Sequence, residues 1–111
     1  PPLVPHKFLK WWGRNLNKEN ILKWLGDVSK IYTHQQKYSQ RVEQLSQTED
    51  VPIIDIRGAF LKHGNIEELM CEDGTHPNSR GQLLIKRAFI DFFTFYPLLE
   101  NGEIITRRGF V

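Results

Sequence analysis

The sequence predicts an α/β fold, and three observations lead to that prediction. A long stretch with apolar residues at helical spacing comes first, a short apolar run rich in β-branched side chains follows, and a second helical stretch comes after a loop. Near-continuous hydrophobicity over so short a run is typical of a strand covered on both faces, as in a parallel sheet. Since a helix followed by such a strand is half of a βαβ repeat, we predict a parallel sheet flanked by helices.

Length and composition set the limits of this prediction. The chain has 111 residues, of which 40% are hydrophobic and 25% charged, so it forms one globular domain or part of one. Its formal charge of +2 is spread along the sequence, which gives no argument for nucleic-acid binding. The single cysteine, Cys71, excludes an internal disulfide, and no Cys/His spacing indicates a metal site. No apolar run is long enough for a membrane span, and the localisation stays open.

The N-terminal half is expected to be mostly one helix. Pro1–Gly13 is rich in proline and aromatic residues, and we interpret it as a loop with one helical turn. Asn17 is the expected N-cap of a long amphipathic helix from Lys18 to Gln47, in which apolar residues recur at steps of three and four. Gly26 weakens that helix and marks a bend or a close helix contact.

The expected strand begins after this helix. Val51–Ile56 is the apolar run, and Pro52 near its start is compatible with a strand because the first position need not donate to a ladder. Residues 57–72 are interpreted as a connecting loop with a short helical piece at residues 66–70.

The C-terminal part is expected to hold a second helix and a tail. The helix runs from Ser79 or Arg80 to Phe95, and Pro97 stops it. The tail contains a turn at Asn101-Gly102 and a small β-prone run at residues 103–106.

A short polar turn before the second helix carries the candidate chemistry. Asp73 and His76 lie three residues apart, in a turn that Gly74 makes flexible and Pro77 makes stiff. In a catalytic triad a carboxylate orients a histidine through one ring nitrogen and leaves the other to take the nucleophile's proton. The alternative is structural, because these residue types also make good turns and Asn78 or Ser79 can cap the helix that follows.

The turn and its surroundings resemble the C-terminal half of SGNH/GDSL-type hydrolases. In that family the last sequence block is Asp-x-x-His, often within Asp-Gly-x-His-Pro-Asn and followed shortly by Gly, as at Asp73–Asn78 and Gly81 here. The preceding helix, the Val-Pro-Ile-Ile-Asp-Ile run and the start at Pro1 match the family order as well, so the resemblance covers residues 1–96. It implies a three-layer α/β/α, flavodoxin-like fold of which this chain supplies only the C-terminal portion, with residues 97–111 as a tail.

The resemblance also implies a function. His76 corresponds to the general base that activates a serine, and Asp73 to the residue that orients it, in an esterase or acylhydrolase that forms an acyl-enzyme without a cofactor. The chain lacks the family's Gly-Asp-Ser and Gly-x-Asn-Asp blocks and an oxyanion-hole glycine. We therefore expect an upstream segment or a second chain to supply them for a small ester substrate. The alternative is a non-catalytic SGNH-like module that binds a partner.

Several other residues are candidates for lining the substrate pocket. Trp11 and Trp12 lie in a segment that runs near the active site in the family, and Phe60 and Met70 lie in the loop before the turn. For each of the four, the alternative is packing in the core. Asp55, at the end of the expected strand, is interpreted as a hydrogen-bonded structural carboxylate. A half-domain would also expose apolar surface, so we expect self-association or poor solubility.

Overall fold

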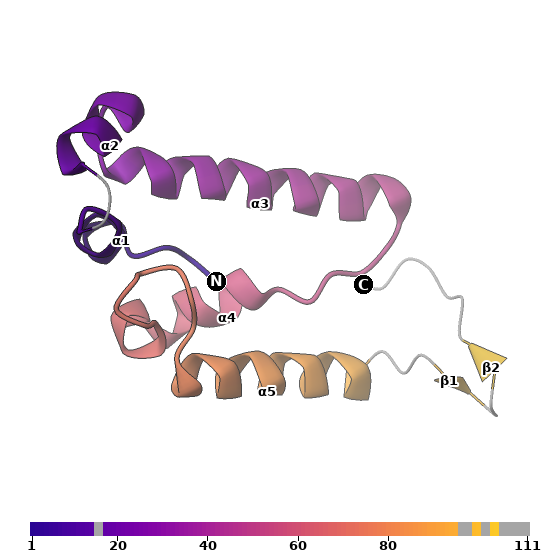
Figure 1. Cartoon of the computed structure of the whole chain (residues 1–111). Helices are drawn as coiled ribbons and strands as arrows, with labels where there is room; N and C mark the ends of the chain where they lie inside the picture. The colour runs from indigo at the N-terminus through magenta and orange to yellow at the C-terminus, as the bar shows by residue number, and fades with distance from the viewer. Residues whose placement is uncertain (15–16, 96–98, 101–102, 105–111) are drawn as a thin grey trace.

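The chain folds mainly into helices. A computed structural model describes residues 1–14, 17–95, 99–100 and 103–104 (Figure 1). The helices and strands are α1 (Pro5–Trp12), α2 (Lys18–Leu25), α3 (Ser29–Glu49), α4 (Ile56–His63), the 3-10 helix η1 (Ile66–Leu69), α5 (Ser79–Phe95), β1 (Leu99–Glu100) and β2 (Glu103–Ile104). The long helices α3 and α5 lie on opposite sides of the N-terminal segment and α4 (Figure 1).

The prediction of an α/β fold is wrong for the described residues. They form no parallel sheet and no α/β/α layers of the flavodoxin-like SGNH type. The two strands make only a short antiparallel pair, in which Leu99 pairs with Ile104 and Glu100 with Glu103. This pair agrees with the β-prone run expected in the tail, while the turn at Asn101-Gly102 and Pro97 lie outside the described residues.

The apolar run expected to be a strand is an irregular connection between α3 and α4. Residues 51–55 have no regular secondary structure, and Val51 is 57% exposed. A strand is stable only when its backbone groups bond to a neighbouring strand, and the described residues offer this run none. Its last residue, Ile56, instead begins α4.

The single long helix predicted for residues 18–47 is two helices, α2 and α3. Asn17 is the N-cap, as predicted: its Oδ1 accepts hydrogen bonds from the backbone N–H groups of Glu19 at 2.9 Å and Asn20 at 3.3 Å. Gly26 ends α2 with a φ of 82°, which disfavours residues with a side chain. The helical periodicity was therefore interpreted correctly, but Gly26 ends a helix rather than bending it.

Helix α4 was not predicted, because the segment that contains it was interpreted as a loop. Asp55 caps its start, since Oδ1 accepts a hydrogen bond from the Gly58 N–H at 2.8 Å, and Gly64 ends it with a φ of 91°. The short helical piece and the second helix were predicted close to their observed bounds as η1 and α5. Helix α1 is longer than the single turn expected, and Pro5 stands at its first position, where no donor is needed.

A small core joins the N-terminal segment to α4, η1 and α5. Its buried members are Val4, Phe60, Leu69 and Met70, and half-buried apolar side chains from α4, η1 and α5 pack against them. Phe60 is fully buried at its centre. The core therefore lies directly beneath the turn that carries Asp73 and His76.

The N-terminal segment is tied to α3 by one side chain. The Gln35 Oε1 accepts hydrogen bonds from the Leu3 N–H at 3.0 Å and from Arg57 Nη1 at 3.3 Å, and its Nε2 donates to the Pro1 carbonyl at 2.7 Å. Arg57 also lies over the ring of Tyr32, 4.9 Å from its centre. These bonds position the segment beside the core.

Candidate active site at the Asp73 to His76 turn

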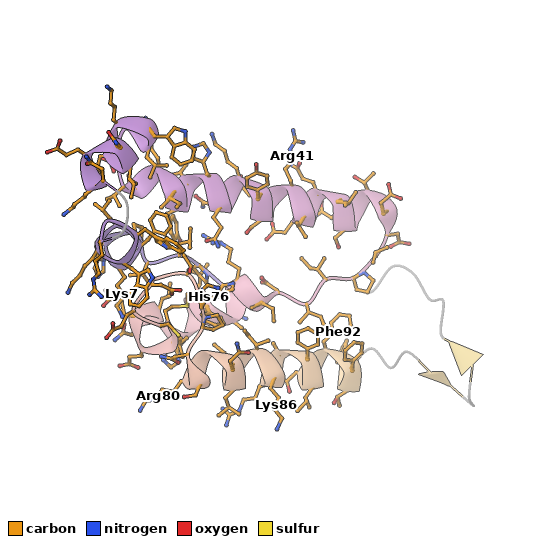
Figure 2. The ribbon with its side chains drawn as sticks, viewed as in Figure 1. Lys7, Arg41, His76, Arg80, Lys86 and Phe92 are labelled. Atoms are coloured by element: carbon orange, nitrogen blue, oxygen red, sulfur yellow. The ribbon has the colours of Figure 1, made fainter. Side chains whose placement is uncertain are left out.

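The turn between η1 and α5 is closed by backbone hydrogen bonds. Met70 and Pro77 form an isolated antiparallel bridge, the Cys71 N–H donates to the His76 carbonyl at 2.8 Å, and the Gly74 N–H donates to the Cys71 carbonyl at 3.1 Å. These bonds hold the two ends of the loop together. His76 lies three residues before α5, within this closed turn (Figure 2).

Gly74 fits this turn against α1. It has a φ of 72°, and a Cβ at this position would lie 2.6 Å from the Val4 carbonyl oxygen and 2.8 Å from the Phe8 nitrogen. The Val4 N–H also donates to the Gly74 carbonyl at 3.0 Å. Backbone conformation and space both require glycine here, so the turn and the N-terminal segment form one unit.

Asn78 joins the turn to α5. Its Oδ1 accepts from the N–H groups of Arg80 at 3.0 Å and Gly81 at 3.1 Å, which caps the helix, and its Nδ2 donates to the carbonyls of Glu68 at 2.8 Å and Met70 at 3.2 Å. Asn78 is therefore the cap that the structural interpretation of the turn expected. A Cβ at Gly81 would lie 2.3 Å from the Leu69 carbonyl oxygen, so this glycine permits the close approach of α5 to η1.

Asp73 and His76 form a directed pair within this frame. The Asp73 Oδ1 accepts from the N–H groups of Thr75 and His76, both at 3.0 Å, and its Oδ2 is hydrogen-bonded to His76 Nδ1. The Asp73 side chain is only 13% exposed, whereas that of His76 is 73% exposed. The carboxylate is thus fixed by the turn and presents the imidazole to the outside.

These hydrogen bonds keep Asp73 ionised. Burial of the carboxylate acts to raise its pKa, but the bonds from the His76 ring and from the backbone of His76 and Thr75 together lower the pKa well below its usual value. An ionised carboxylate can only accept hydrogen bonds, so Nδ1 of His76 is the nitrogen that carries the proton. Thr75 Oγ1 lies 3.1 Å from the same nitrogen.

The second ring nitrogen is available for chemistry. Nε2 of His76 has no hydrogen-bond partner among the described residues. A neutral imidazole with a protonated Nδ1 has an acceptor at Nε2, which is the arrangement of a general base. The serines of the chain supply no partner for it: Ser46 donates to the Val51 carbonyl, and within the described segments no serine is hydrogen-bonded to the ring.

The predicted pocket residues are not brought together at this site. Phe60 and Met70 are 0% and 3% exposed in the core, which agrees with the alternative of a packing role. Trp11 and Trp12 lie on α1, where Arg14 covers the Trp11 ring at 5.2 Å and Trp12 packs on Phe8 at 6.2 Å. A substrate contact for these four residues stays a prediction.

The remaining candidates have structural positions. Asp55 is exposed and caps α4 rather than ending a strand, and Cys71 is exposed beside the turn. No group of three or more His, Cys, Asp or Glu side chains within the described residues could hold a metal ion. In this part of the chain, no helix combines the length and the apolarity that crossing a bilayer requires.

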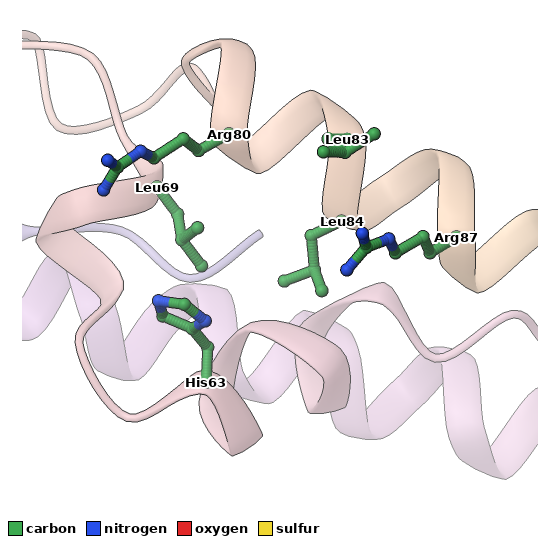
Figure 3. Close-up of a pocket in the computed structure, with 6 residues that line it drawn as sticks. All are labelled: His63, Leu69, Arg80, Leu83, Leu84 and Arg87. Carbon is green, nitrogen blue, oxygen red and sulfur yellow. The ribbon is translucent and has the colours of Figure 1, made fainter.

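A hollow of about 260 Å³ lies between α4, η1 and α5. Arg80 and Arg87 extend over it from α5, and His63 faces them from the end of α4 (Figure 3). Leucines complete its lining: Leu69, Leu83 and Leu84. His76 and the four predicted pocket residues do not line this hollow.

The sequence does not reveal the full structural roles of Gln35 and Asn78. Gln35 showed no signal, because a glutamine on a polar helix is ordinarily exposed. Asn78 was recognised only as a helix cap, although its second pair of bonds closes the turn. Only the fold brings the carbonyls of Glu68 and Met70 within reach of its amide.

Comparison of the chain with models of protein families, with curated proteins and with solved structures finds no match. Membership of the SGNH/GDSL-type hydrolases therefore stays a prediction based on the motif.

Proposed function

We propose that this chain supplies the acid–base pair of a serine ester hydrolase, with His76 as general base and Asp73 as the residue that orients it. The supporting observation is the asymmetric pair: a buried, ionised carboxylate bonded to Nδ1 of an exposed imidazole whose Nε2 is open. The bond from Oδ2 to the ring is not one of those that hold the turn, because backbone hydrogen bonds, Oδ1 of Asp73 and the Asn78 side chain hold it.

The reaction needs groups that this chain lacks. A serine placed at Nε2 of His76 would lose its proton to the imidazole as it attacks an ester carbonyl, and the imidazole would return that proton to the leaving alcohol. Water would then release the acyl group by the same route. The serine and the oxyanion donors would come from an upstream segment or a second chain, since losing even one oxyanion donor costs about 3 to 4 kcal/mol.

The test is ester hydrolysis by the complete protein, measured as p-nitrophenyl acetate turnover. His76→Ala should lower kcat/KM by a factor of about 10² to 10⁴, which is the usual contribution of general base catalysis. His63→Ala is the matched control, because His63 is also partly exposed and bonded to a carboxylate, that of Glu68 at 3.4 Å. Equal rates for wild type and His76→Ala would sink the proposal.

The second candidate function is a non-catalytic module in which the turn serves only the fold. The structural roles of Gly74, Asn78 and Gly81 favour it, because these three residues of the motif fit the fold without any catalytic use. Reading the residues encoded before Pro1 discriminates between the two functions. A Gly-Asp-Ser and a Gly-x-Asn-Asp block there would favour the hydrolase, and their absence would favour the module.

A further inference from the structure

The charges of the chain are unevenly distributed along its length. Residues 1–30 contain six Lys and Arg against two Asp and Glu, a formal charge of +4. The whole chain carries +2, so the remaining 81 residues carry −2. The cationic part forms α1 and α2, which contact each other at one end of the molecule (Figure 1). We call α1 and α2, with the Gly13 and Arg14 that follow α1, the basic end.

Exposed cations of the basic end are not neutralised by the rest of the fold. Lys10, Lys18 and Lys23 are exposed, and none has an ion-pair partner among the described residues. Unpaired cations at one end of a protein attract an anionic surface within about 8 Å at physiological ionic strength.

All three tryptophans of the chain also lie in the basic end. Trp24 is 83% exposed, directly after Lys23 on α2, and no ring or cation packs on it in the described residues. An indole side chain carries a large apolar surface that water solvates poorly. Such a ring beside lysines is typical of the interface between lipid headgroups and acyl chains.

The ring geometry favours a lipid surface over a nucleic acid. Binding of a single strand uses several aromatic faces on which successive bases stack. In the basic end, the Arg14 guanidinium covers Trp11 and Trp12 packs on Phe8, which leaves Trp24 as the one tryptophan without a described partner. A lipid surface needs only one exposed indole at headgroup level when neighbouring lysines bind the headgroup charges.

We propose that the basic end is a peripheral docking surface for anionic phospholipid membranes, with Trp24 inserted at headgroup level and the lysines on the headgroup charges. The Asp73 to His76 turn packs against α1, but Trp24 lies on α2, and the docking surface does not depend on the proposed hydrolase function.

The test is binding of the protein to vesicles of phosphatidylcholine alone and of phosphatidylcholine with phosphatidylserine, measured by co-flotation. Binding should require phosphatidylserine and weaken as salt is raised. Lys23→Gln should weaken it about fivefold, the effect of one charge near such a surface. Trp24→Ala should weaken binding further still and reduce the blue shift of tryptophan emission on binding, since Trp11 and Trp12 remain.

Matched controls come from the other helices. Tyr38→Ala removes an aromatic side chain that is 75% exposed on α3, and Lys86→Gln removes an exposed cation on α5. Both should leave vesicle binding unchanged, and far-UV circular dichroism should match for all variants because every position is exposed. Equal binding to both vesicles, equal losses for Tyr38→Ala and Trp24→Ala, or capture by single-stranded DNA in place of vesicles would overturn the proposal.

Discussion

Asp73 serves two purposes through two different oxygens. Oδ1 organises the turn by accepting two backbone N–H groups, and Oδ2 holds His76. Because the three bonds all favour the charged form, protonation of this carboxyl costs the folded chain more than the unfolded one. The spacing of the two residues predicted their pairing, and the fold adds the burial of one partner and the exposure of the other.

The lowered pKa of Asp73 predicts a pH dependence of stability. A carboxyl whose pKa is lowered by folding stabilises the folded chain above its unfolded pKa of about 4, and that contribution is lost as pH falls below this value. The free energy of unfolding of the wild type, measured with urea, should therefore fall between pH 6 and acid conditions. The part of this fall that is due to Asp73 should be about 1 to 2 kcal/mol, which is typical of hydrogen bonds to a charged group.

Asp73→Asn is the variant that isolates this effect, because the amide keeps an oxygen for the turn and cannot ionise. Its free energy of unfolding should be lower than wild type at pH 6, and the difference should shrink as pH falls below about 4. If the two proteins differed in free energy of unfolding by the same amount at every pH, the lowered pKa of Asp73 would be contradicted.

At the scale of elements, caps decide where the helices begin and end. Asn17, Asp55 and Asn78 each cap a helix with a side-chain oxygen, and Gly26 and Gly64 end helices with a positive φ. The sequence predicted the Asn17 cap and left Asn78 or Ser79 as alternatives for the cap of α5, because both stand before a clear helical pattern. It did not predict α4, because its eight residues are too few for periodicity to separate them from a loop.

The two asparagine caps should differ in their contribution to stability. Asn17→Ala removes the cap of α2 alone, and the expected loss is about 1 kcal/mol. Asn78→Ala also leaves the carbonyls of Glu68 and Met70 without their donor, so we expect about 2 to 3 kcal/mol.

Urea unfolding of the two variants measures this difference, and hydrogen exchange of the Gly81 amide locates it. The amide should exchange faster in Asn78→Ala and remain protected in Asn17→Ala. Similar losses of stability in both variants would show that the hydrogen bonds from the Asn78 amide to the Glu68 and Met70 carbonyls contribute nothing.

At the scale of the whole molecule, apolar side chains remain uncovered on the two long helices. Tyr38, Val42 and Leu45 on α3 are 55 to 75% exposed. Helix α5 exposes a comparable set: Leu83, Phe89, Ile90, Phe93 and Phe95. The described core contains few buried residues by comparison, which limits its contribution to stability.

This exposure predicts that the chain associates with itself, because association removes apolar surface from water. Sedimentation velocity should show a weight-average mass that rises with concentration. A double substitution, Leu45→Glu with Ile90→Glu, should shift the distribution toward monomer, whereas Trp24→Ala should change it little. A monodisperse wild-type monomer at all concentrations would contradict the prediction.

The sequence by itself determined the features that depend on near neighbours. Helical periodicity, the caps at Asn17 and Asn78 and the closeness of Asp73 to His76 all arise within a few residues along the chain, where spacing sets geometry. Tertiary structure alone decided whether residues 51–55 became a strand. A strand depends on a partner strand that can be far away in the sequence, and the described residues provide none. Tertiary structure also decided that Gly74 lies against α1, that Gln35 holds the N-terminal segment, and that Asp73 is buried while His76 is exposed.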